Sequence, residues 1–290
     1  MKLYVNRSLR FEFNNETSSF DASGNKKISI SNGKAQVSLQ SSGNLFGTQV
    51  NVSIFGLSLD MLAALSAKAM GLFGTSTERI SMKIFVENTA IFVGYMTSSI
   101  ANMNSAPNSA LMITATANAD LQNKVAKPFS VSGPTAVKDV ISGICKAAGY
   151  SPLINGLDGV MVSNPHYVGS VFDQLQRICD DLDVAMSVSP PTIAFWPNKE
   201  TKDSVRPLIS AQYGLIGYPI FSNGGVMLQT QFSSLLTTGR SIQLETSLPH
   251  ASGVYQLTSV THELSSWTEG GTWHSICIAN RILEANQSGG

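Results

Sequence analysis

The sequence is short of charged residues. They make up 13% of the 290 residues, with 19 Lys and Arg against 19 Asp and Glu, whereas an ordinary soluble domain contains about 25%. Zero net charge argues against free nucleic acid as the main partner, because binding it requires a basic field. A low charge content together with 43% hydrophobic residues also argues against disorder. The chain instead contains 39 Ser and 19 Thr, so hydroxyl groups supply most of its polarity.

Cysteine is equally scarce. Cys145, Cys179 and Cys277 are odd in number and widely spaced, and no two of them form a CxxC pair. This pattern argues against a disulfide framework and against a structural zinc site. We expect all three to be small buried hydrophobic groups in a reducing compartment.

The sequence has no long uninterrupted hydrophobic run. Its most apolar stretch, residues 57–73, contains Asp60 and Lys68, so it does not resemble a bilayer-spanning helix of about 20 apolar residues. Charged residues also interrupt the N-terminal segment, which therefore lacks the apolar region of a secretory signal peptide. We expect a soluble protein, made in a cytoplasm and not inserted directly into a membrane.

The few charges are unevenly distributed. Residues 120–206 carry 8 basic and 9 acidic groups, which is an ordinary density. Residues 207–280 carry four charges, and Glu87 is the single charge in residues 84–119. A normally charged middle therefore lies between two flanks that are nearly uncharged.

Both flanks show the alternation of apolar and polar residues that predicts strands with one buried face. The N-terminal runs are Ile28/Ile30, Ala35/Val37/Leu39, Val50/Val52/Ile54, Ile80/Met82/Ile84/Val86 and Leu111/Ile113/Ala115/Ala117. The C-terminal runs are Val226/Leu228, Ile242/Leu244 and His274/Ile276/Ile278. One helix interrupts the first flank, with Ser58 as its cap, apolar residues from Leu59 to Ala69 at helical spacing, and Gly71 at its end.

The middle has a different pattern. Apolar residues at helical spacing predict one helix over residues 137–148, stopped at Gly149, and a second over residues 170–182. Two short apolar runs, residues 184–188 and 192–196, then flank a Pro-Pro turn and predict a hairpin. Helices followed by a hairpin indicate a small α+β domain.

These patterns predict an α+β, mainly β fold with three parts. Residues 1–119 form an antiparallel β-barrel domain with one helix, residues 120–205 a small α+β domain, and residues 206–290 a second antiparallel β-barrel domain. The two flanks also echo each other, because each ends in a long hairpin, residues 91–118 and residues 253–280. A duplicated domain and a chance likeness of two Ser/Thr-rich hairpins both explain this echo.

The search for catalytic motifs is negative. The sequence contains no GxSxG, HExxH, GxGxxG or GxxxxGK[ST] pattern. His250, His262 and His274 lie twelve residues apart, and they would bind a metal only if three strands brought them together; the alternative is that they are partly buried hydrogen-bonding groups. A further cluster, Asp180, Asp181 and Asp183, is typical of a solvated helix end. We predict no enzymatic activity, no cofactor, and no catalytic, cofactor-binding or metal-binding residues.

The C-terminal flank resembles a known family. Residues 209–280 are similar to the C-terminal region of baseplate hub proteins of contractile-tailed bacteriophages, and residues 172–196 resemble the middle of such hubs. The matching elements are Gly217-Tyr218-Pro219, Gly224-Gly225-Val226-Met227, Leu235-Leu236 before Gly239, Gly253-Val254-Tyr255, His262, and Gly270-Gly271-Thr272-Trp273. The similarity of residues 209–280 covers about a quarter of the chain and includes no catalytic residues.

This resemblance implies a structural role in a virion. Hubs of this family contain two tail-tube-like β-barrel domains and assemble as homotrimers whose pseudo-sixfold ring meets the hexameric tail tube protein. The opposite face of the ring accepts the central spike protein, and tape-measure protein and DNA in transit occupy the axis. The resemblance therefore implies a baseplate protein assembled in the host bacterial cytoplasm. The sequence departs from the hub pattern in having no lysozyme-like segment.

The charge pattern fits such a ring, because permanently buried interfaces are poor in charge. We expect both long hairpins to contribute to the ring, so that Ser98→Lys or Ser259→Lys weakens trimerisation. Two alternatives remain open. A tail-tip module that binds host-surface glycans would display Trp267 and Trp273 on exposed loops, and a metal hydrolase would use the three histidines.

Overall fold

A computed structural model describes residues 8–42, 47–69, 78–104, 108–222 and 224–282. The predicted fold class is confirmed, since the chain is α+β and mainly antiparallel β. It divides into two compact units, each made of several chain segments. Unit 1 comprises residues 1–39, 49–119 and 262–273, and unit 2 comprises residues 40–48, 120–261 and 274–290.

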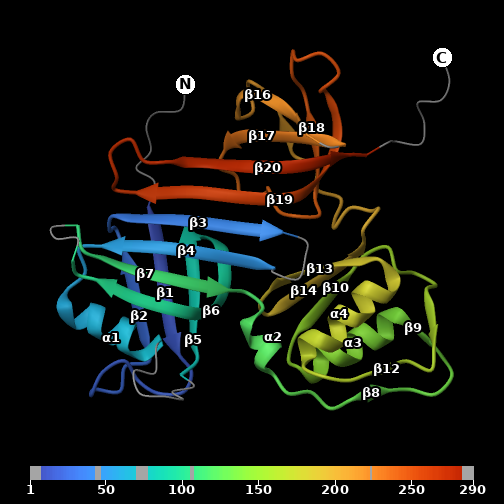
Figure 1. The fold of residues 1–290 in the computed structure, drawn as a ribbon, viewed down its shortest axis with the longest axis horizontal. Helices are drawn as coiled ribbons and strands as arrows, with labels where there is room; N and C mark the ends of the chain where they lie inside the picture. The colour runs from blue at the N-terminus through green and yellow to red at the C-terminus, as the bar shows by residue number, and fades with distance from the viewer. Residues whose placement is uncertain (1–7, 43–46, 70–77, 105–107, 223, 283–290) are drawn as a thin grey trace. The chain divides into compact units, whose positions relative to one another are not determined.

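Unit 1 is an antiparallel sheet folded into two layers. Its hydrogen-bonded order is β3-β4-β7-β6-β5-β1-β2, with the end of β19 (Gly253–Ser266) beside β3. In Figure 1, β1, β2 and β5 run across behind β3, β4 and β7. The strands are β1 (Leu9–Asn15), β2 (Lys27–Ser31), β3 (Ala35–Ser42), β4 (Thr48–Phe55), β5 (Ile80–Val86), β6 (Thr89–Asn102) and β7 (Ala110–Thr116).

Strand β6 belongs to both layers. Its first half pairs with β5 and its second half with β7. The register with β7 shifts between Met96 and Ser98, and the Thr97 hydroxyl within this bulge donates a hydrogen bond of 3.1 Å to the carbonyl of Thr114. A bulge bends a strand and increases its twist, which allows one long strand to pass from one layer to the other.

The alternation read from the sequence forms the core of unit 1. Inward-facing residues that are at most 3% exposed include Phe11, Phe13, Val37, Leu39, Val50, Val52, Ile54, Met82, Ile84, Ile113 and Ala115. The predicted helix is α1 (Leu59–Ala69), where the Ser58 hydroxyl accepts a bond from the Met61 amide. Leu62 and Leu65 are buried, whereas Leu59 is 70% exposed. The predicted helix end at Gly71 lies outside the described residues.

The α+β part of unit 2 follows the sequence prediction closely. Helices α3 (Val137–Ala147) and α4 (Val171–Leu182) contact a sheet with the order β10-β14-β13. The strands of this sheet are β10 (Ser151–Ile154), β13 (Val184–Ser189) and β14 (Thr192–Pro197). The remaining short elements, which the sequence did not indicate, are α2 (Ala119–Asn123), β8 (Phe129–Ser130), β9 (Pro134–Ala136), β11 (Met161–Ser163) and β12 (His166–Tyr167).

Helix α4 begins with a capping box. The Ser170 hydroxyl accepts a bond of 3.1 Å from the Asp173 amide, and the Asp173 carboxylate accepts one of 2.9 Å from the Ser170 amide. These two bonds satisfy amides that the helix leaves without partners at its start. The Ser170 hydroxyl, followed by its backbone N–H, holds the pKa of the Asp173 carboxyl below its ordinary value.

The C-terminal strands of unit 2 have the order β16-β17-β20-β19, and β15 and β18 attach to β19 through β18. Their bounds are β15 (Leu208–Ile209), β16 (Leu215–Ser222), β17 (Gly225–Gln231), β18 (Ser241–Leu244) and β20 (Trp273–Arg281). The core between them consists of Ile209, Val226, Leu228, Leu236, Ile242, Leu244, Tyr255, Leu257, Val260, Cys277 and Ala279. These strands therefore enclose a hydrophobic core of their own.

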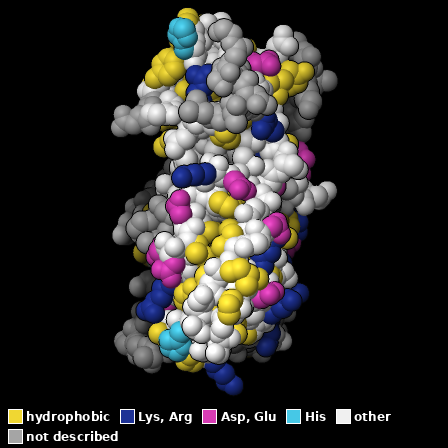
Figure 2. All heavy atoms as spheres, turned by 90° about the vertical axis from the view of Figure 1, so that its right-hand side faces the viewer, with side chains coloured by type: hydrophobic (Ala, Val, Ile, Leu, Met, Phe, Trp, Pro, Cys, Tyr) yellow, Lys and Arg dark blue, Asp and Glu magenta, His cyan; other side chains and the backbone are white. Residues whose placement is uncertain are grey.

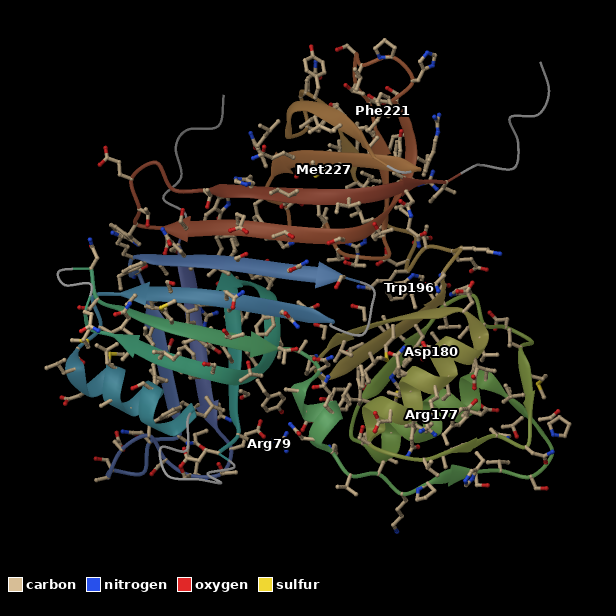
Figure 3. The ribbon with its side chains drawn as sticks, viewed as in Figure 1. Arg79, Arg177, Asp180, Trp196, Phe221 and Met227 are labelled. Carbon is tan, nitrogen blue, oxygen red and sulfur yellow. The ribbon has the colours of Figure 1, made fainter. Side chains whose placement is uncertain are left out.

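Within unit 2, the α+β part is fastened to the C-terminal strands. Trp196, which Figure 3 labels, is 2% exposed, and a Cβ placed on Gly239 would lie 2.3 Å from its ring. Arg240 pairs with Asp203 at 2.6 Å and also donates to the carbonyl of Leu235. The packing of the Trp196 ring against Gly239 and the partly buried ion pair of Asp203 with Arg240 thus join the α+β part to the C-terminal strands.

No described helix combines the length and the apolar character that crossing a bilayer requires.

Candidate interaction surfaces

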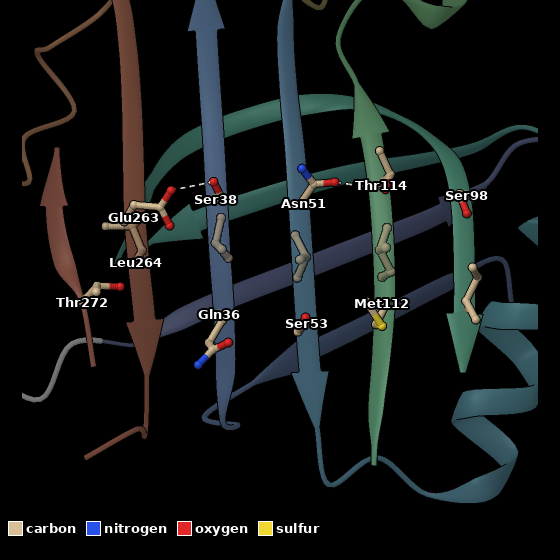
Figure 4. Close-up of a pocket in the computed structure, with 14 residues that line it drawn as sticks. Gln36, Ser38, Asn51, Ser53, Ser98, Met112, Thr114, Glu263, Leu264 and Thr272 are labelled. Carbon is tan, nitrogen blue, oxygen red and sulfur yellow. Dashed lines mark hydrogen bonds between the residues drawn. The ribbon is translucent and has the colours of Figure 1, made fainter. Parts of the chain in front are cut away.

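The described part of unit 1 carries a groove across the solvent-facing side of five adjacent strands, which we call the polar groove. Figure 4 shows β19, β3, β4, β7 and β6 side by side beneath it. Its volume is about 530 Å³. The lining residues are Gln36, Val37, Ser38, Asn51, Val52, Ser53, Ser98, Ile100, Met112, Ile113, Thr114, Glu263, Leu264 and Thr272.

Strand register arranges the groove side chains in rows. Asn51 lies opposite Thr114, which lies opposite Ser98, and the Thr114 hydroxyl donates to the Asn51 side chain at 3.1 Å. At one end, the Ser38 hydroxyl donates to the Glu263 carboxylate at 2.7 Å. Glu263 is the one charged residue among the lining residues. Hydroxyl and amide groups therefore dominate this surface, and it offers no field of either sign.

One row of the polar groove is more apolar. Ser53 lies opposite Met112, and Met112 lies opposite Ile100. Met112 is 48% exposed and Ile100 is 51% exposed. These are large exposed fractions for hydrophobic side chains on a well-ordered sheet.

Unit 2 carries a second surface, which we call the apolar patch: Ile216, Ile220, Met227, Ile276 and Ile278. In one row Ile220 lies opposite Met227, and Met227 lies opposite Ile278. In the next row Gln229 separates Ile216 from Ile276. The exposed fractions of the five patch residues run from 36% to 59%. Figure 3 labels Met227 on β17 within this sheet.

The apolar patch corrects the reading of His274/Ile276/Ile278 as a buried alternating face. In β20 the buried residues are Ser275, Cys277 and Ala279, each 0% exposed, and the isoleucines point to solvent. The side chains that fit the interior here are small. The sequence did contain a signal, because an alternation of large and small residues differs from one of apolar and polar residues.

Strand β16 forms one edge of the sheet among the described residues. Its pairing with β17 is interrupted between Ile216 and Ile220, and Pro219 within that interval has no amide hydrogen to donate. A proline and a bulge are devices that stop an edge strand from adding further strands. Tyr218 and Phe221 beside them are 67% and 57% exposed, but Phe221 lies opposite the buried Val226 and is therefore on the other face of the sheet from the apolar patch.

The three histidines considered as metal ligands, His250, His262 and His274, do not form a metal site among the described residues. Among the described residues, no group of three His, Cys, Asp or Glu side chains could hold a metal ion. His262 is buried in unit 1, whereas His250 is exposed and His274 half-buried in unit 2. The metal-hydrolase alternative therefore has no site in the described part of the chain.

The acidic cluster is a helix end, as its sequence position indicated. The Asp180 carboxylate accepts from Gln176 and that of Asp183 from Asn198, both at 2.6 Å. Asp183 is also the residue that terminates α4, in the left-handed conformation. These side chains satisfy local hydrogen bonds.

The three cysteines are buried and carry free thiols. Burial raises the pKa of Cys145, Cys179 and Cys277 to about 12 in each case; for Cys179 the nearby Asp180 raises it further. The reactive thiolate form is therefore scarce near neutral pH.

The tryptophans differ in exposure. Trp196 is a core residue, Trp267 is 60% exposed in the turn between β19 and β20, and Trp273 is half-buried. Trp267 thus meets the condition set for a glycan-binding surface, and Trp273 meets it only partly.

Three glycines in the segments that resemble hub proteins lie where a side chain would not fit. A Cβ on Gly225 would lie 2.0 Å from the Ala279 carbonyl oxygen, and one on Gly271 would lie 2.1 Å from the Ser265 hydroxyl. Gly239 is restricted by Trp196 as described above. These three glycines therefore allow close approaches within the fold.

On the face seen in Figure 2, Lys and Arg side chains are interspersed with Asp and Glu side chains. Neither sign forms a continuous field on that face. This surface offers no support for a nucleic-acid or polyanion site there.

The sequence matches no protein family model and no curated protein. Solved structures match over most of the chain. A 43 kDa tail protein of prophage MuSo2 from Shewanella oneidensis superposes with a TM-score of 0.61 at 9% identity, covering 94% of this chain and 98% of that one. A tail protein from Neisseria meningitidis MC58 gives 0.58 at 10% identity, covering 94% and 96%.

A third match comes from a secretion system. The Escherichia coli c3393 protein gives a TM-score of 0.56 at 12% identity, covering 87% of this chain and 74% of that one. It is described as a component of the type VI secretion system with structural similarity to the T4 bacteriophage tail proteins gp27 and gp5. The chain therefore has a fold found in phage tail proteins and in a related secretion-system component.

Proposed function

We propose that this protein is a structural component of a contractile phage tail, namely the baseplate hub that joins the tail tube to the central spike. The carrying observation is the superposition on the 43 kDa prophage tail protein, which includes nearly the whole length of both chains. A match of this extent involves the arrangement of elements along both chains, whereas the sequence resemblance involves about a quarter of one chain.

The surfaces of the chain support a structural role. The polar groove and the apolar patch are sheet faces, and Glu263 is the one charged residue among the residues that make up the two surfaces. Charge-poor surfaces of this kind fit contacts that stay buried in an assembly. We propose a homotrimeric ring that contacts the tail tube protein, the spike protein and the tape-measure protein in the virion.

Three domains are proposed within this hub. Residues 1–119 and 206–290 would be the two tail-tube-like β-barrel domains, and residues 120–205 the small α+β domain. Limited proteolysis tests these boundaries, because linkers between domains are cleaved before their cores.

The proposed hub function is tested by measuring ring formation and binding to the tail tube protein. The purified chain is expected to form ring-shaped trimers in negative-stain images and to co-sediment with the tail tube protein of its own phage. A chain that binds neither the tube protein nor the spike protein would contradict the hub proposal. The tube protein of an unrelated contractile phage serves as the control for non-specific sedimentation.

A second candidate function is glycan binding at a tail tip. The observation that favours it is the 60% exposure of Trp267, since exposed aromatic rings bind sugar faces. A glycan array probed with the wild-type chain and with Trp267→Ala tests it. Binding that the substitution abolishes would favour this alternative, and equal signals from both proteins would remove it.

A further inference from the structure

The apolar patch is too exposed to be explained by the fold of a single chain. Its five residues are each at least 36% exposed and lie on three adjacent strands. Contiguous apolar patches on a monomer often have a function. Five large side chains gathered on one sheet face are a patch of this kind, and it can form part of the ~800 Å² that each partner contributes to a stable interface.

The lack of charge on the apolar patch limits the kind of surface that can cover it. Residues 207–280 hold four charges, and none of them is a patch residue. A partner that placed charges against this surface would have to desolvate them without compensation. The matching surface must therefore be apolar and poor in charge.

The chain itself provides a surface of that description. Ile100 and Met112 are about half exposed in unit 1, and the residues around them in the polar groove are neutral apart from Glu263, whose carboxylate already accepts from Ser38. Both surfaces are solvent-facing sides of antiparallel sheets. The interrupted pairing at Pro219 disfavours simple strand addition at β16, which leaves side-chain contacts as the main means of association.

We propose that the apolar patch of one copy contacts the Ile100–Met112 surface of a second copy of this chain. The contact is heterologous, since two different surfaces meet, and a heterologous contact repeats from copy to copy until it closes into a ring. This inference rests on the proposed homotrimeric hub and assigns residues to its interface.

The first test substitutes one patch residue. Ile220→Lys places a charge at the most exposed position of the patch, and it should weaken self-association at least about tenfold, because interface centres tolerate unpaired charge poorly. Met161→Lys is the matched control, since Met161 is 55% exposed on β11 of the same unit and lies outside both surfaces. Association is measured by sedimentation equilibrium over a concentration series. Circular dichroism and the melting temperature establish that both variants are folded.

The second test shows directly whether the apolar patch of one copy contacts the Ile100–Met112 surface of another. Ile100→Glu alone should also weaken association, and combining the Ile220→Lys and Ile100→Glu chains should restore much of it, because the introduced charges then oppose each other across the contact. Restoration by this pair, and no restoration by Ile220→Lys with Ile100→Lys, supports the proposal. Unchanged association of Ile220→Lys, a wild-type chain that stays monomeric, or failure of the charge pair to restore association would overturn it.

The results that would refute this interface differ from the results that would refute the proposed hub function. The hub role is judged by co-sedimentation of the wild-type chain with the tail tube and spike proteins. A wild-type trimer that binds the tube protein, with Ile220→Lys still trimeric, would refute this interface and leave the hub intact. Loss of tube binding by the wild-type chain would refute the hub while the self-association data still decide the interface.

Discussion

Ile278 of β20 lies opposite Met227 of β17 on the solvent-facing side of the unit 2 sheet, although both neighbours of Ile278 in the chain are completely buried. A large apolar residue is therefore outside and small residues are inside. Full exposure of a large apolar side chain costs about 1.5–3 kcal/mol relative to burial, and Ile278 and Met227, which are 41% and 36% exposed, each bear part of that cost. That cost is recovered when another molecule covers the surface.

The ion pair of Asp203 with Arg240 should contribute to the stability of unit 2. Asp203→Asn is expected to lower the free energy of unfolding by about 1–3 kcal/mol, the usual range for a hydrogen bond to a charged group. Urea denaturation measures this. Asp158→Asn is the control, because the Asp158 side chain is 87% exposed and its pairing with Lys138 should matter little.

The same pair predicts a dependence on pH. Burial alone would raise the pKa of the Asp203 carboxyl, but the hydrogen bond and charge of Arg240 outweigh burial and hold it below the ordinary value of 3.8. A lowered folded-state pKa stabilises the protein above pH 3.8, and this contribution is lost as the pH falls through the folded value. The difference between wild type and Asp203→Asn should therefore shrink below about pH 4. A difference that stays constant down to pH 2 would contradict this account.

The capping box of α4 should be measurable by itself. Ser170→Ala removes the hydroxyl that accepts from the Asp173 amide and is expected to cost about 1 kcal/mol of unfolding free energy. Ser170→Thr should retain most of the stability, since threonine also caps helices and keeps the hydroxyl. Ser130→Ala on the exposed β8 strand should have almost no effect. Equal losses for Ser170→Ala and Ser170→Thr would show that the cap is not the cause.

Gly239 should tolerate no side chain. Gly239 has a φ of 84° and Gly133 one of 92°, so alanine at either position meets the same backbone strain of about 1–2 kcal/mol. Only Gly239→Ala also places its Cβ 2.3 Å from the Trp196 ring, and overpacking adds about 1–3 kcal/mol. Gly239→Ala should therefore be clearly less stable than Gly133→Ala in thermal or urea unfolding. Equal stability of the two variants would mean that Trp196 moves aside freely.

The cysteines should be unreactive in the folded chain. With pKa values of about 12, the thiols remain protonated at pH 8 and are also shielded from reagents. An aromatic disulfide reagent should react with none of the three rapidly in buffer and with all three in 6 M guanidinium chloride. Rapid reaction of even one thiol in buffer would contradict the burial described for it.

The long hairpins are predicted to take part in the proposed ring. Ser98 lines the polar groove, and Ser259 is half-buried in β19. Either Ser98→Lys or Ser259→Lys should weaken trimerisation, because each introduces a charge into a surface that is poor in charge. Light scattering measures the mass. Trimers of normal mass and stability in both variants would remove the hairpins from the interface.

Local patterns in the sequence identified most of the elements. Alternating apolar residues predicted most of the unit 1 strands, though not β1. Helical spacing placed α4 almost to the residue, because burial depends on near neighbours in the chain. Which face of β20 is buried could not be predicted in this way. Ile276 and Ile278 are more hydrophobic than Ser275 and Cys277, so a rule that buries the most apolar side chains assigns the wrong face whenever a surface is meant for a partner.

The candidate surfaces were less accessible to sequence reasoning. The rows of the polar groove bring together β3, β4, β6, β7 and β19, and this pairing is set by contacts between distant segments. The bond between Ser38 and Glu263 joins residues that are 225 positions apart.

The contribution of residues 262–273 to unit 1 has a consequence for synthesis in the cell. A ribosome that has finished residue 119 has made most of unit 1, yet the strand that bonds to Ser38 and Gly33 through Glu263 and Ser266 emerges only after 142 further residues. At about 5–20 residues per second this delay is on the order of ten seconds. The nascent chain therefore spends that interval with an unfinished sheet edge, and unit 1 completes its sheet only after most of unit 2 has been synthesised.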